Sequence, residues 1–317
     1  MKKYDVIAIG ELNVDLILNG IEKSMEIGKE IFAKDMLLTL GSSTAIFAAN
    51  TSSIGAKVGF VGMIGKDSFG RLVKDSLTEK GVSTEFIIET DKYATGVTVG
   101  LNYGEERAMV TYQGPMDVMT FADINPSVFE LTKHIHLSSV FVQEGLKNDL
   151  VKILKYAIEK GITTSLDVQW DPSEEWDFDF KSILPFVTVF LPNDTEITML
   201  TNSTSLEEAI EKVKPYINTC VIKQGNKGSL LVQKEGEPHF LNSFLNTEVA
   251  DAIGAGDSFN SGFIYQFVKG GSSHICQYFG NLMGAINTTS AGGTGAFSSK
   301  EAIERIAKIR FSQNIEL

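Results

Sequence analysis

The stretch from Val249 to Phe263 reads VADAIGAGDSFNSGF and places two acids and a glycine-rich turn between two apolar segments. Gly254, Ala255 and Gly256 carry little or no side chain, and Asp257 follows them at the start of a predicted helix. The free backbone N–H groups at such a helix start form a site for an anion. A carboxylate placed there therefore needs either a partner or a chemical role.

The local pattern allows two interpretations of Asp257. In the first, the N–H groups of the turn surround a phosphoryl group and Asp257 accepts a proton from an attacking alcohol. In the second, Asp257 complements the helix dipole and the glycines only permit a tight turn. The local chemistry alone slightly favours the second interpretation. The chain contains no GxxxxGK[ST] sequence, which excludes a P-loop enzyme.

The composition limits the classes of partner. The chain has 317 residues, of which 43% are hydrophobic and 21% charged, as in ordinary globular proteins. The formal net charge of −12 argues against a nucleic-acid partner. Cys220 and Cys276 lie in apolar segments, which predicts buried, reduced thiols and a cytoplasmic location. The first apolar run, VIAIG, is too short for a signal peptide or a membrane span, so we expect no membrane partner.

Short apolar runs bounded by glycine alternate with helix-like stretches, which predicts a three-layer α/β/α fold around a mainly parallel central sheet. The runs predicted as strands are YDVIAIG, KVGFVGMIG, HIHLSSV, ITTSLDV, VTVFLPN and CVIKQG. The predicted helices are Ser43–Ile54, Ser68–Lys80, Leu146–Lys160, Leu206–Lys214, Ala255–Val268, His274–Thr289 and Lys300–Arg310.

Two segments, Leu16–Leu38 and Ala94–Gln113, look instead like strands with alternating polar and apolar residues, and NYGEE at residues 102–106 suggests a hairpin turn. They predict a small second sheet with one exposed face. We expect a single domain over residues 1–317, with lid strands inserted at about residues 14–38 and 94–114. The uncovered apolar face of such a lid predicts a homodimer through the lid.

Candidate site residues follow the predicted strands, where open α/β sheets bind their ligands. These candidates are Asn13, Asp15, Gly41, Ser42, Asp167, Asn193, Glu196, Gly225 and Asp257. One surface carboxylate alone is weak support for a site, but repeated placement at strand ends predicts one. Gln143 and Glu144 are further candidates in a predicted exposed loop.

Several motifs in order make the chain resemble the PfkB, or ribokinase-like, family of carbohydrate and nucleoside kinases. The D-T-x-G-A-G-D stretch of that family is matched by DAIGAGD at residues 251–257. The other matching stretches are AIGELNVDLI, IGAKVGFVGMIGKDSFGRLV, VTYQG, LPNDTE and VIKQGNKGSLL. The resemblance extends essentially from end to end. It implies a ribokinase-like fold with a lid and the transfer of phosphate from ATP, with Mg²⁺, to an alcohol group of a sugar or sugar-like molecule.

On the nucleotide side, the resemblance implies that Asp257 is the catalytic base and that Gly254, Ala255 and Gly256 form the anion hole. Asn193 and Glu196 match the family's N-x-x-E motif, in which Glu196 would hold Mg²⁺ through water. The same pair could instead cap a helix, and both roles are compatible. The other residues implied to bind the nucleotide are Lys223, Gly225, Gly228, Asn281, Gly293 and Gly295.

Asp251 corresponds to a residue that helps to bind a monovalent cation in some members of the family. Ala252 replaces the usual threonine beside it, which leaves a requirement for K⁺ open.

On the acceptor side, the resemblance implies that Asp15 binds sugar hydroxyls. The residues implied to lie beside it are Asn13, Gly41, Ser42 and Gln113. Where the family usually has G-G-x-x-x-N, this chain has Gly41, Ser42 and, in place of the asparagine, Ile46. Ile46 indicates either an altered, partly apolar acceptor or a packing replacement without ligand contact, and the two are equally supported.

Two other functions compete with a sugar kinase. The acceptor could be a nucleoside, as in related kinases. The chain could also be a catalytically weak, ligand-binding relative, as Ser42, Ile46 and Ala252 suggest. The intact Asp257 and anion turn argue against this last function.

Overall fold

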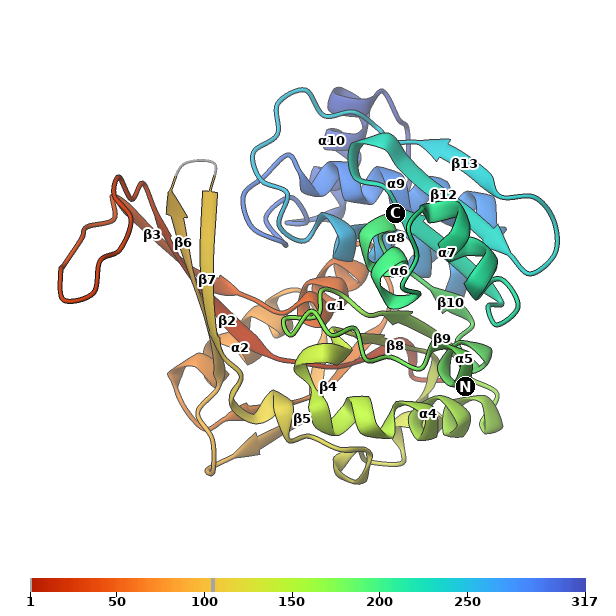
Figure 1. Ribbon diagram of the computed structural model, residues 1–317, viewed down its shortest axis with the longest axis horizontal. Coiled ribbons are helices and arrows are strands. Elements are labelled where there is room, and N and C mark those ends of the chain that lie inside the picture. Colours follow the sequence, from red (N-terminus) through yellow and green to blue (C-terminus); the bar gives the residue numbers. More distant parts are fainter. Residues whose placement is uncertain (1, 104–105) are drawn as a thin grey trace.

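A nine-stranded sheet forms the middle of the protein in the computed structural model, which describes residues 2–103 and 106–317 (Figure 1). The strand order is β13-β12-β11-β10-β9-β8-β1-β4-β5. The strands are β1 (Tyr4–Ile9), β4 (Val58–Gly65), β5 (Ser83–Thr90), β8 (Thr132–Ser138), β9 (Thr163–Asp167), β10 (Val189–Phe190), β11 (Thr219–Lys223), β12 (Gly228–Gln233) and β13 (His239–Asn242). The pairs from β5 to β11 are parallel, and only β12 and β13 pair antiparallel at one edge.

Helices cover both faces of this sheet and bury a separate apolar core on each. One core includes residues of α1 (Ser43–Ser53), α2 (Ser68–Glu79), α8 (Ala255–Val268), α9 (Ser273–Asn287) and α10 (Lys300–Phe311). The other includes residues of α3 (Val128–Leu131), α4 (Glu144–Glu159), α5 (Phe180–Ile183), α6 (Asp194–Leu200) and α7 (Leu206–Val213). Successive residues of β1 enter opposite cores, since Val6 packs in the first and Ile7 in the second. The predicted three-layer α/β/α fold with a mainly parallel sheet is confirmed.

The predicted helices agree with the observed ones to within two residues at each end, and α8 has the predicted bounds. Strands β5, β12 and β13 and the short helices α3, α5 and α6 were not among the predicted elements. The two antiparallel strands, β12 and β13, extend the sheet beyond the part that the βα alternation predicted. Among the described helices, none combines the length and hydropathy needed to cross a bilayer.

A four-stranded second sheet projects from the body of the protein, on the left in Figure 1. Its order is β3-β2-β6-β7, and only β2 and β6 pair parallel. Its strands are β2 (Asn13–Asn19), β3 (Asp35–Leu40), β6 (Gly96–Tyr103) and β7 (Glu106–Tyr112). The β6–β7 hairpin is as predicted, but residues 104 and 105 of its turn lie outside the described residues.

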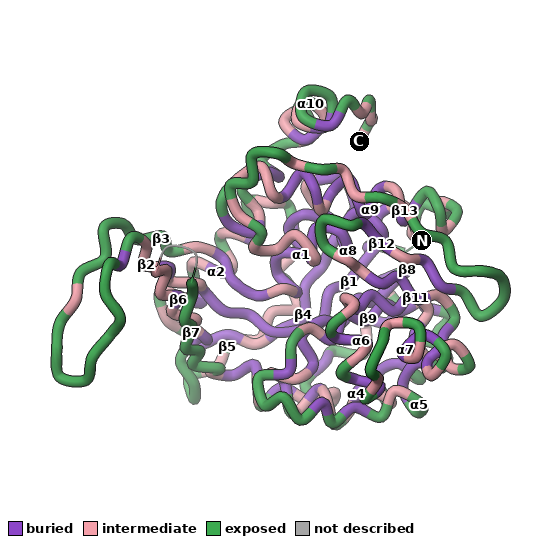
Figure 2. The backbone as a smooth tube through the Cα atoms, turned by 45° about the horizontal axis from the view of Figure 1, so that its top comes forward, coloured by how far each residue is buried: buried purple, intermediate pink, exposed green. Residues whose placement is uncertain are grey.

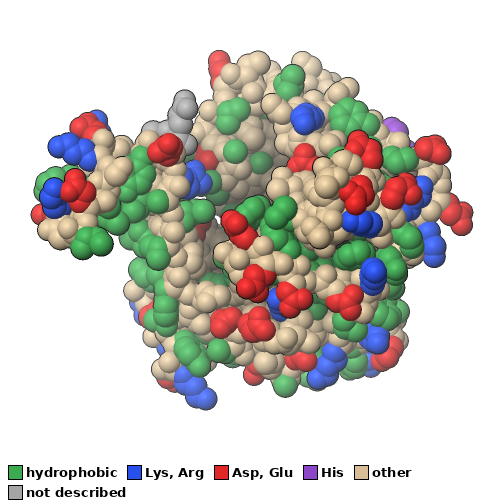
Figure 3. All heavy atoms as spheres, viewed as in Figure 1, with side chains coloured by type: hydrophobic (Ala, Val, Ile, Leu, Met, Phe, Trp, Pro, Cys, Tyr) green, Lys and Arg blue, Asp and Glu red, His purple; other side chains and the backbone are tan. Residues whose placement is uncertain are grey.

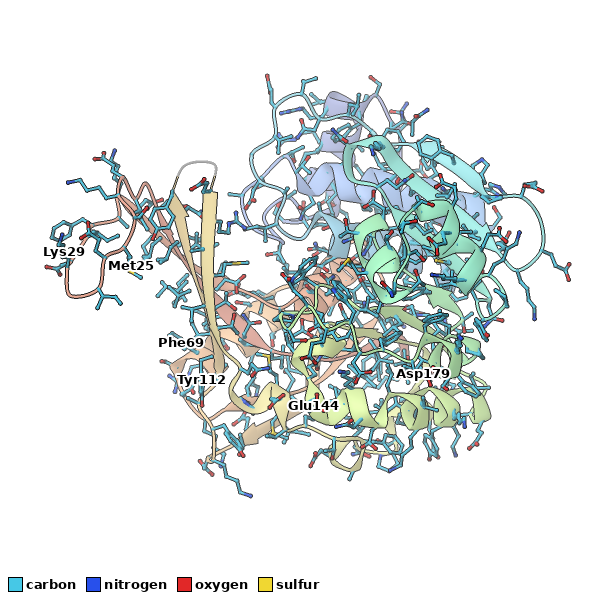
Figure 4. All side chains as sticks on the ribbon, in the orientation of Figure 1. Met25, Lys29, Phe69, Tyr112, Glu144 and Asp179 are labelled. Carbon is cyan, nitrogen blue, oxygen red and sulfur yellow. The ribbon has the colours of Figure 1, made fainter. Side chains whose placement is uncertain are left out.

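The prediction of strand throughout Leu16–Leu38 is wrong in its middle, because residues 20–34 contain no strand. Gly20 and Gly28 have φ angles of 69° and 83° there, in the left-handed region that interrupts a ladder. Met25 and Lys29 belong to this excursion, the loop of residues 20–34, which Figure 4 shows extending away from the main sheet. Figure 2 shows that it is mostly exposed, in contrast to the buried strands of the main sheet.

Candidate active site

A cavity of about 760 Å³ opens beyond the carboxyl ends of β10 and β11, and its walls include residues of β2, α1 and α8. Figure 3 shows the surface hollowed between the second sheet and the body of the protein. The predicted site residues that line it are Asp15, Ser42, Asn193, Glu196, Lys223, Gly225, Gly228, Gly254, Ala255, Gly256, Asp257 and Asn281. The fold thus brings residues from both ends of the chain into one cavity.

Three other predicted residues lie outside this lining. Asn13 is buried and donates a hydrogen bond from Nδ2 to Asp15 Oδ1 at 2.9 Å. A Cβ added at Gly41 would lie 2.3 Å from the same oxygen, so the backbone there passes close to the carboxylate. Gln113 is exposed and donates to the Val142 carbonyl instead. Asn13 and Gly41 therefore position the Asp15 carboxylate, whereas Gln113 is not part of the described cavity lining.

Asp251 and the glycine run form a support beneath the anion turn. The Asp251 carboxylate accepts hydrogen bonds from the N–H groups of Ile253 and Gly292. Gly293 packs against Gly254, while a Cβ at Gly295 would lie 2.5 Å from the Ala291 carbonyl oxygen. Asp251, Gly293 and Gly295 therefore join two loops and are not part of the described lining.

The anion turn requires a glycine at Gly254. Its φ of 74° lies in the left-handed region, and a Cβ there would come within 2.7 Å of Gly293 Cα. Helix α8 begins directly after it, so the N–H groups of the first helical turn face the cavity.

Replacing Gly254 by alanine is expected to destabilise the protein by about 3 kcal/mol, because alanine disfavours this φ and its methyl group meets the Gly293 backbone. Gly225→Ala is the matched control, since Gly225 has a φ of 56° but open space around its added Cβ. That control should cost only about 1 kcal/mol. Urea denaturation of both variants measures the difference, and equal losses would show that the contact with Gly293 has no energetic effect.

Asp257 is buried at the start of α8 and points into the cavity. Its Oδ1 accepts a hydrogen bond from Gln169 Nε2 at 3.0 Å. Burial, reinforced by the negative charge of Asp167, raises the pKa of Asp257 well above its usual range, against the opposing effect of Lys223. A raised pKa makes this carboxylate a stronger base, which is the property needed to take a proton from an alcohol.

Lys223 is the cation of this site. Its Nζ lies 2.5 Å from Asp167 Oδ2, and both side chains are withdrawn from solvent. A Cβ added at Gly256 would lie 3.6 Å from the same Nζ, so the ammonium group is next to the anion turn. Burial lowers the pKa of Lys223, but Asp167 and Glu196 outweigh it and the net shift is upward. Lys223 therefore stays charged.

Asn193 and Glu196 form the capping box of α6. Asn193 Oδ1 accepts from the Glu196 N–H at 2.7 Å, and Glu196 Oε2 accepts from the Asn193 N–H at 2.8 Å. Burial, followed by repulsion from Asp167, raises the pKa of Glu196 to about 7. The cap proposed as an alternative role is thus present, and it leaves the Glu196 side chain at the cavity wall.

The acids of the site fit a divalent cation. The carboxyl groups of Asp167, Glu196 and Asp257 lie near one ammonium group, that of Lys223, and their oxygens are ligands of the kind that Mg²⁺ prefers. Within the part of the chain that the structure describes, no three His, Cys, Asp or Glu side chains converge as a ready metal cage. The arrangement suits an ion that keeps several waters and is held mainly by phosphate.

Gln169 is a site residue that sequence reasoning missed. It lies two residues after β9 with a φ of 61°, and its Nε2 also donates to Asp167 Oδ2 at 3.0 Å. The side chain therefore bridges Asp167 and Asp257. Its position just after a strand was the only signal, since the sequence does not reveal a left-handed backbone at glutamine.

The prediction that Gln143 lies in an exposed loop is wrong. Its side chain is buried and donates to the Ser138 carbonyl at 2.7 Å and to Glu11 Oε2 at 3.2 Å. The 3₁₀ turn at Val140–Val142 folds the residue inward. Glu11 in turn accepts from the N–H of Thr44, so this buried cluster holds the start of α1.

Ile46 both packs and lines the cavity. It is buried, and a Cβ added at Gly293 would lie 2.4 Å from its Cδ1. Ile46 also belongs to the cavity wall together with Ser42 and Asp15. Its packing against the glycine run is therefore established, and its side chain also forms part of the cavity wall.

Comparison with known proteins shows the family of this chain. The model of the pfkB family of carbohydrate kinases matches residues 3–300. The chain belongs to this family, and it is a carbohydrate kinase, a phosphotransferase with an alcohol group as acceptor. An uncharacterized sugar kinase of Archaeoglobus fulgidus is 29% identical over 234 residues, covering 74% of this chain and 92% of the relative. A 5-dehydro-2-deoxygluconokinase of Lacticaseibacillus casei is 28% identical over 283 residues, covering 84% of each.

Solved structures show the same fold. Ribokinase of Arabidopsis thaliana, complexed with ribose and ATP, superposes with a TM-score of 0.84 at 21% identity, covering 96% of this chain and 99% of that one. A putative ribokinase II from E. coli, in complex with ATP and Mg²⁺, superposes with a TM-score of 0.83 at 19% identity and the same coverage. The fold is therefore ribokinase-like, as the motifs implied.

Proposed function

We propose that the protein transfers the γ-phosphoryl group of ATP to a hydroxyl of a sugar or sugar-like acceptor, with Asp257 as the base. One observation carries this proposal: the anion turn and Asp257 share a single cavity with Asp15 and Ser42. A phosphoryl group at the turn and an alcohol between Asp257 and Asp15 would then meet in line. Gly254, Ala255 and Gly256 would stabilise the transferred oxygens through their N–H groups.

The nucleotide would occupy the part of the cavity formed by Gly225, Gly228, Phe244, Leu245 and Asn281. Asn281 donates to the carbonyls of Leu241 and Asn242, which fixes the wall on this side. Glu196 and Asn193 would hold Mg²⁺ through water, and the ion would neutralise charge on the phosphates. The ribokinase neighbours bound to ATP, in one case with Mg²⁺, support this placement by analogy.

Asp257 would act on the acceptor and not on the nucleotide. In the closed site its carboxylate would take the hydroxyl proton, while Gln169 keeps the carboxylate oriented. Lys223 would remain charged beside the phosphoryl group and counter the negative charge of Asp167. The second sheet would act as a lid that excludes water before transfer, since an activated phosphoryl group otherwise reacts with water.

An acceptor screen tests the proposal. Purified protein, ATP and Mg²⁺ are incubated with sugars, sugar acids including 5-dehydro-2-deoxygluconate, and nucleosides, and ADP release is followed. The 5-dehydro-2-deoxygluconokinase relatives suggest 5-dehydro-2-deoxygluconate as an acceptor. A nucleoside kinase of Methanocaldococcus jannaschii, which has a similar fold, is the reason for including nucleosides. Binding of ATP and a sugar without ADP release across the panel would favour the ligand-binding alternative.

Acceptor binding is expected to depend on pH through Asp15. Burial raises the pKa of Asp15 to about 6, partly offset by a hydrogen bond from Asn13. As pH falls through 6, the carboxylate becomes protonated and loses acceptor capacity for sugar hydroxyls. Calorimetry should show the affinity for the acceptor falling by up to about tenfold per pH unit below 6. Asp15→Asn should bind weakly with no such dependence, whereas an unchanged pH dependence in this variant would assign the titration to another group.

Three finer features belong to the proposal. A homodimer would cover the exposed apolar side chains of the second sheet, which include Met36, Leu38 and Met109, and light scattering tests it.

A cytoplasmic location would give access to ATP and suits the two buried free cysteines. A monovalent cation near Asp251 would share that carboxylate with the N–H groups it already accepts, and activity in KCl against NaCl tests the requirement.

A further inference from the structure

A second, smaller cavity of about 90 Å³ adjoins the main one, and Asp15 and Ile253 line both. The rest of its wall comes from the second sheet and consists of Ile17, Thr98, Gly100, Asn102, Arg107 and Met109. This side cavity therefore joins the main one at Asp15 and Ile253 and extends it along the second sheet.

Arg107 is held in place at this side cavity. On β7 it pairs in register with Asn102 of β6, and its Nε donates to Asn102 Oδ1 at 3.1 Å. Asn102 Nδ2 donates in turn to Asn19 Oδ1 at 2.7 Å, so three strands contribute to the chain of bonds. None of the ion pairs found among residues 2–103 and 106–317 includes Arg107. Arg107 is exposed, and the side-chain hydrogen bond found for it uses only Nε, so its terminal N–H groups are accessible to a ligand.

Each of the two cavities has one positively charged side chain in its wall. Lys223 and Arg107 are the cations among the described residues that line them. Lys223 is engaged with Asp167 next to the anion turn, where phosphate would bind. Arg107 lines the side cavity together with Asp15 and is not among the residues that line the main cavity. A cation there has no role toward the nucleotide and a direct one toward the acceptor.

We propose that Arg107 binds a carboxylate of the acceptor, so that the acceptor is a sugar acid rather than a neutral sugar. This inference rests on the proposed function. The planar guanidinium presents paired N–H groups that match the two oxygens of a carboxylate. One guanidinium balances one negative charge, whereas a phosphate group would bring nearly two charges close to Asp15. The small cavity, with Thr98 and Asn102 at its wall, suits a group of carboxylate size.

The test compares matched acceptors and matched variants. D-gluconate and its keto and deoxy derivatives are compared with the corresponding neutral hexoses and hexitols and with hexose 6-phosphates, both for ADP release and for binding by calorimetry. Arg107→Met removes the positive charge. Arg107→Lys keeps the charge but lacks the paired N–H groups of the guanidinium. Lys34→Met is the control. Lys34 is an exposed lysine that pairs with Glu22 in the excursion before β3, so its loss changes the net charge equally.

The wild type is expected to prefer a sugar acid over its neutral counterpart. Arg107→Met should lower kcat/KM and affinity for the acid about 10- to 100-fold, with the neutral compound unchanged. Arg107→Lys should lose less, and Lys34→Met should match the wild type. Equal losses for acid and neutral acceptors, a preference for hexose phosphates, or no binding of any acid by the wild type would each overturn the assignment of Arg107. Phosphorylation of neutral sugars alone would overturn it while the proposed function stands, whereas failure of every acceptor to release ADP would overturn the proposed function itself.

Discussion

Asp257→Asn is expected to reduce turnover about 10²- to 10⁴-fold while ATP still binds, because the amide cannot accept the proton of the attacking alcohol. Asparagine keeps the size of the side chain and can still accept the hydrogen bond from Gln169 Nε2. The loss should therefore appear in kcat rather than in the affinity for either substrate. Steady-state kinetics with the best acceptor of the screen, combined with calorimetry for ATP, measures both.

The same variant should be more stable than the wild type at neutral pH. Burial raises the pKa of Asp257 in the folded protein, so the folded state binds more protons than the unfolded state between pH 3.8 and that raised pKa. Wild-type stability therefore falls as pH rises through this range, and the asparagine variant lacks that loss.

A surface carboxylate supplies the control. Asp75 is exposed on α2, and Asp75→Asn should leave turnover unchanged. Near-normal turnover in Asp257→Asn would contradict the assigned base and return Asp257 to the role of a charge at the helix start.

Lys223→Met is expected to lower the free energy of unfolding by about 3–5 kcal/mol at neutral pH, because it removes one partner of a buried ion pair. Asp167, Glu196 and Asp257 would then share a buried site without a protein cation. We also expect weaker ATP binding, since the ammonium group lies beside the anion turn. Urea denaturation and calorimetry measure the two effects.

A charge-balanced double variant separates charge from packing. Lys223→Met combined with Asp167→Asn should recover at least half of the lost stability, because the uncompensated carboxylate is gone while the amide oxygen still accepts from Gln169. ATP binding should stay weak in the double variant. If the double variant were as unstable as Lys223→Met alone, the loss would come from packing of the lysine stem and the electrostatic account would be wrong.

Local sequence signals predicted most of the layers and much of the cavity. The apolar runs that became β1, β4 and β8 are buried on both faces, so their composition alone marked them as central strands. The starts of the predicted helices were equally clear, because small or polar residues precede them, as Ser42 does for α1 and Ser299 for α10. The antiparallel edge formed by β12 and β13 had no such signal, since pairing direction depends on the path of the chain.

The sequence by itself determined the alternation of strands and helices, the DAIGAGD turn and the residues that follow the strands, because these depend on neighbours along the chain. Only the tertiary structure decided which of them meet. Gln169 reaches Asp257 across 88 positions, and Lys223 reaches Asp167 across 56. Such contacts are set by strand order and packing. The meeting of Arg107 and Asp15 in one cavity is of the same kind, since it exists only once β7 pairs with β6 and β6 with β2.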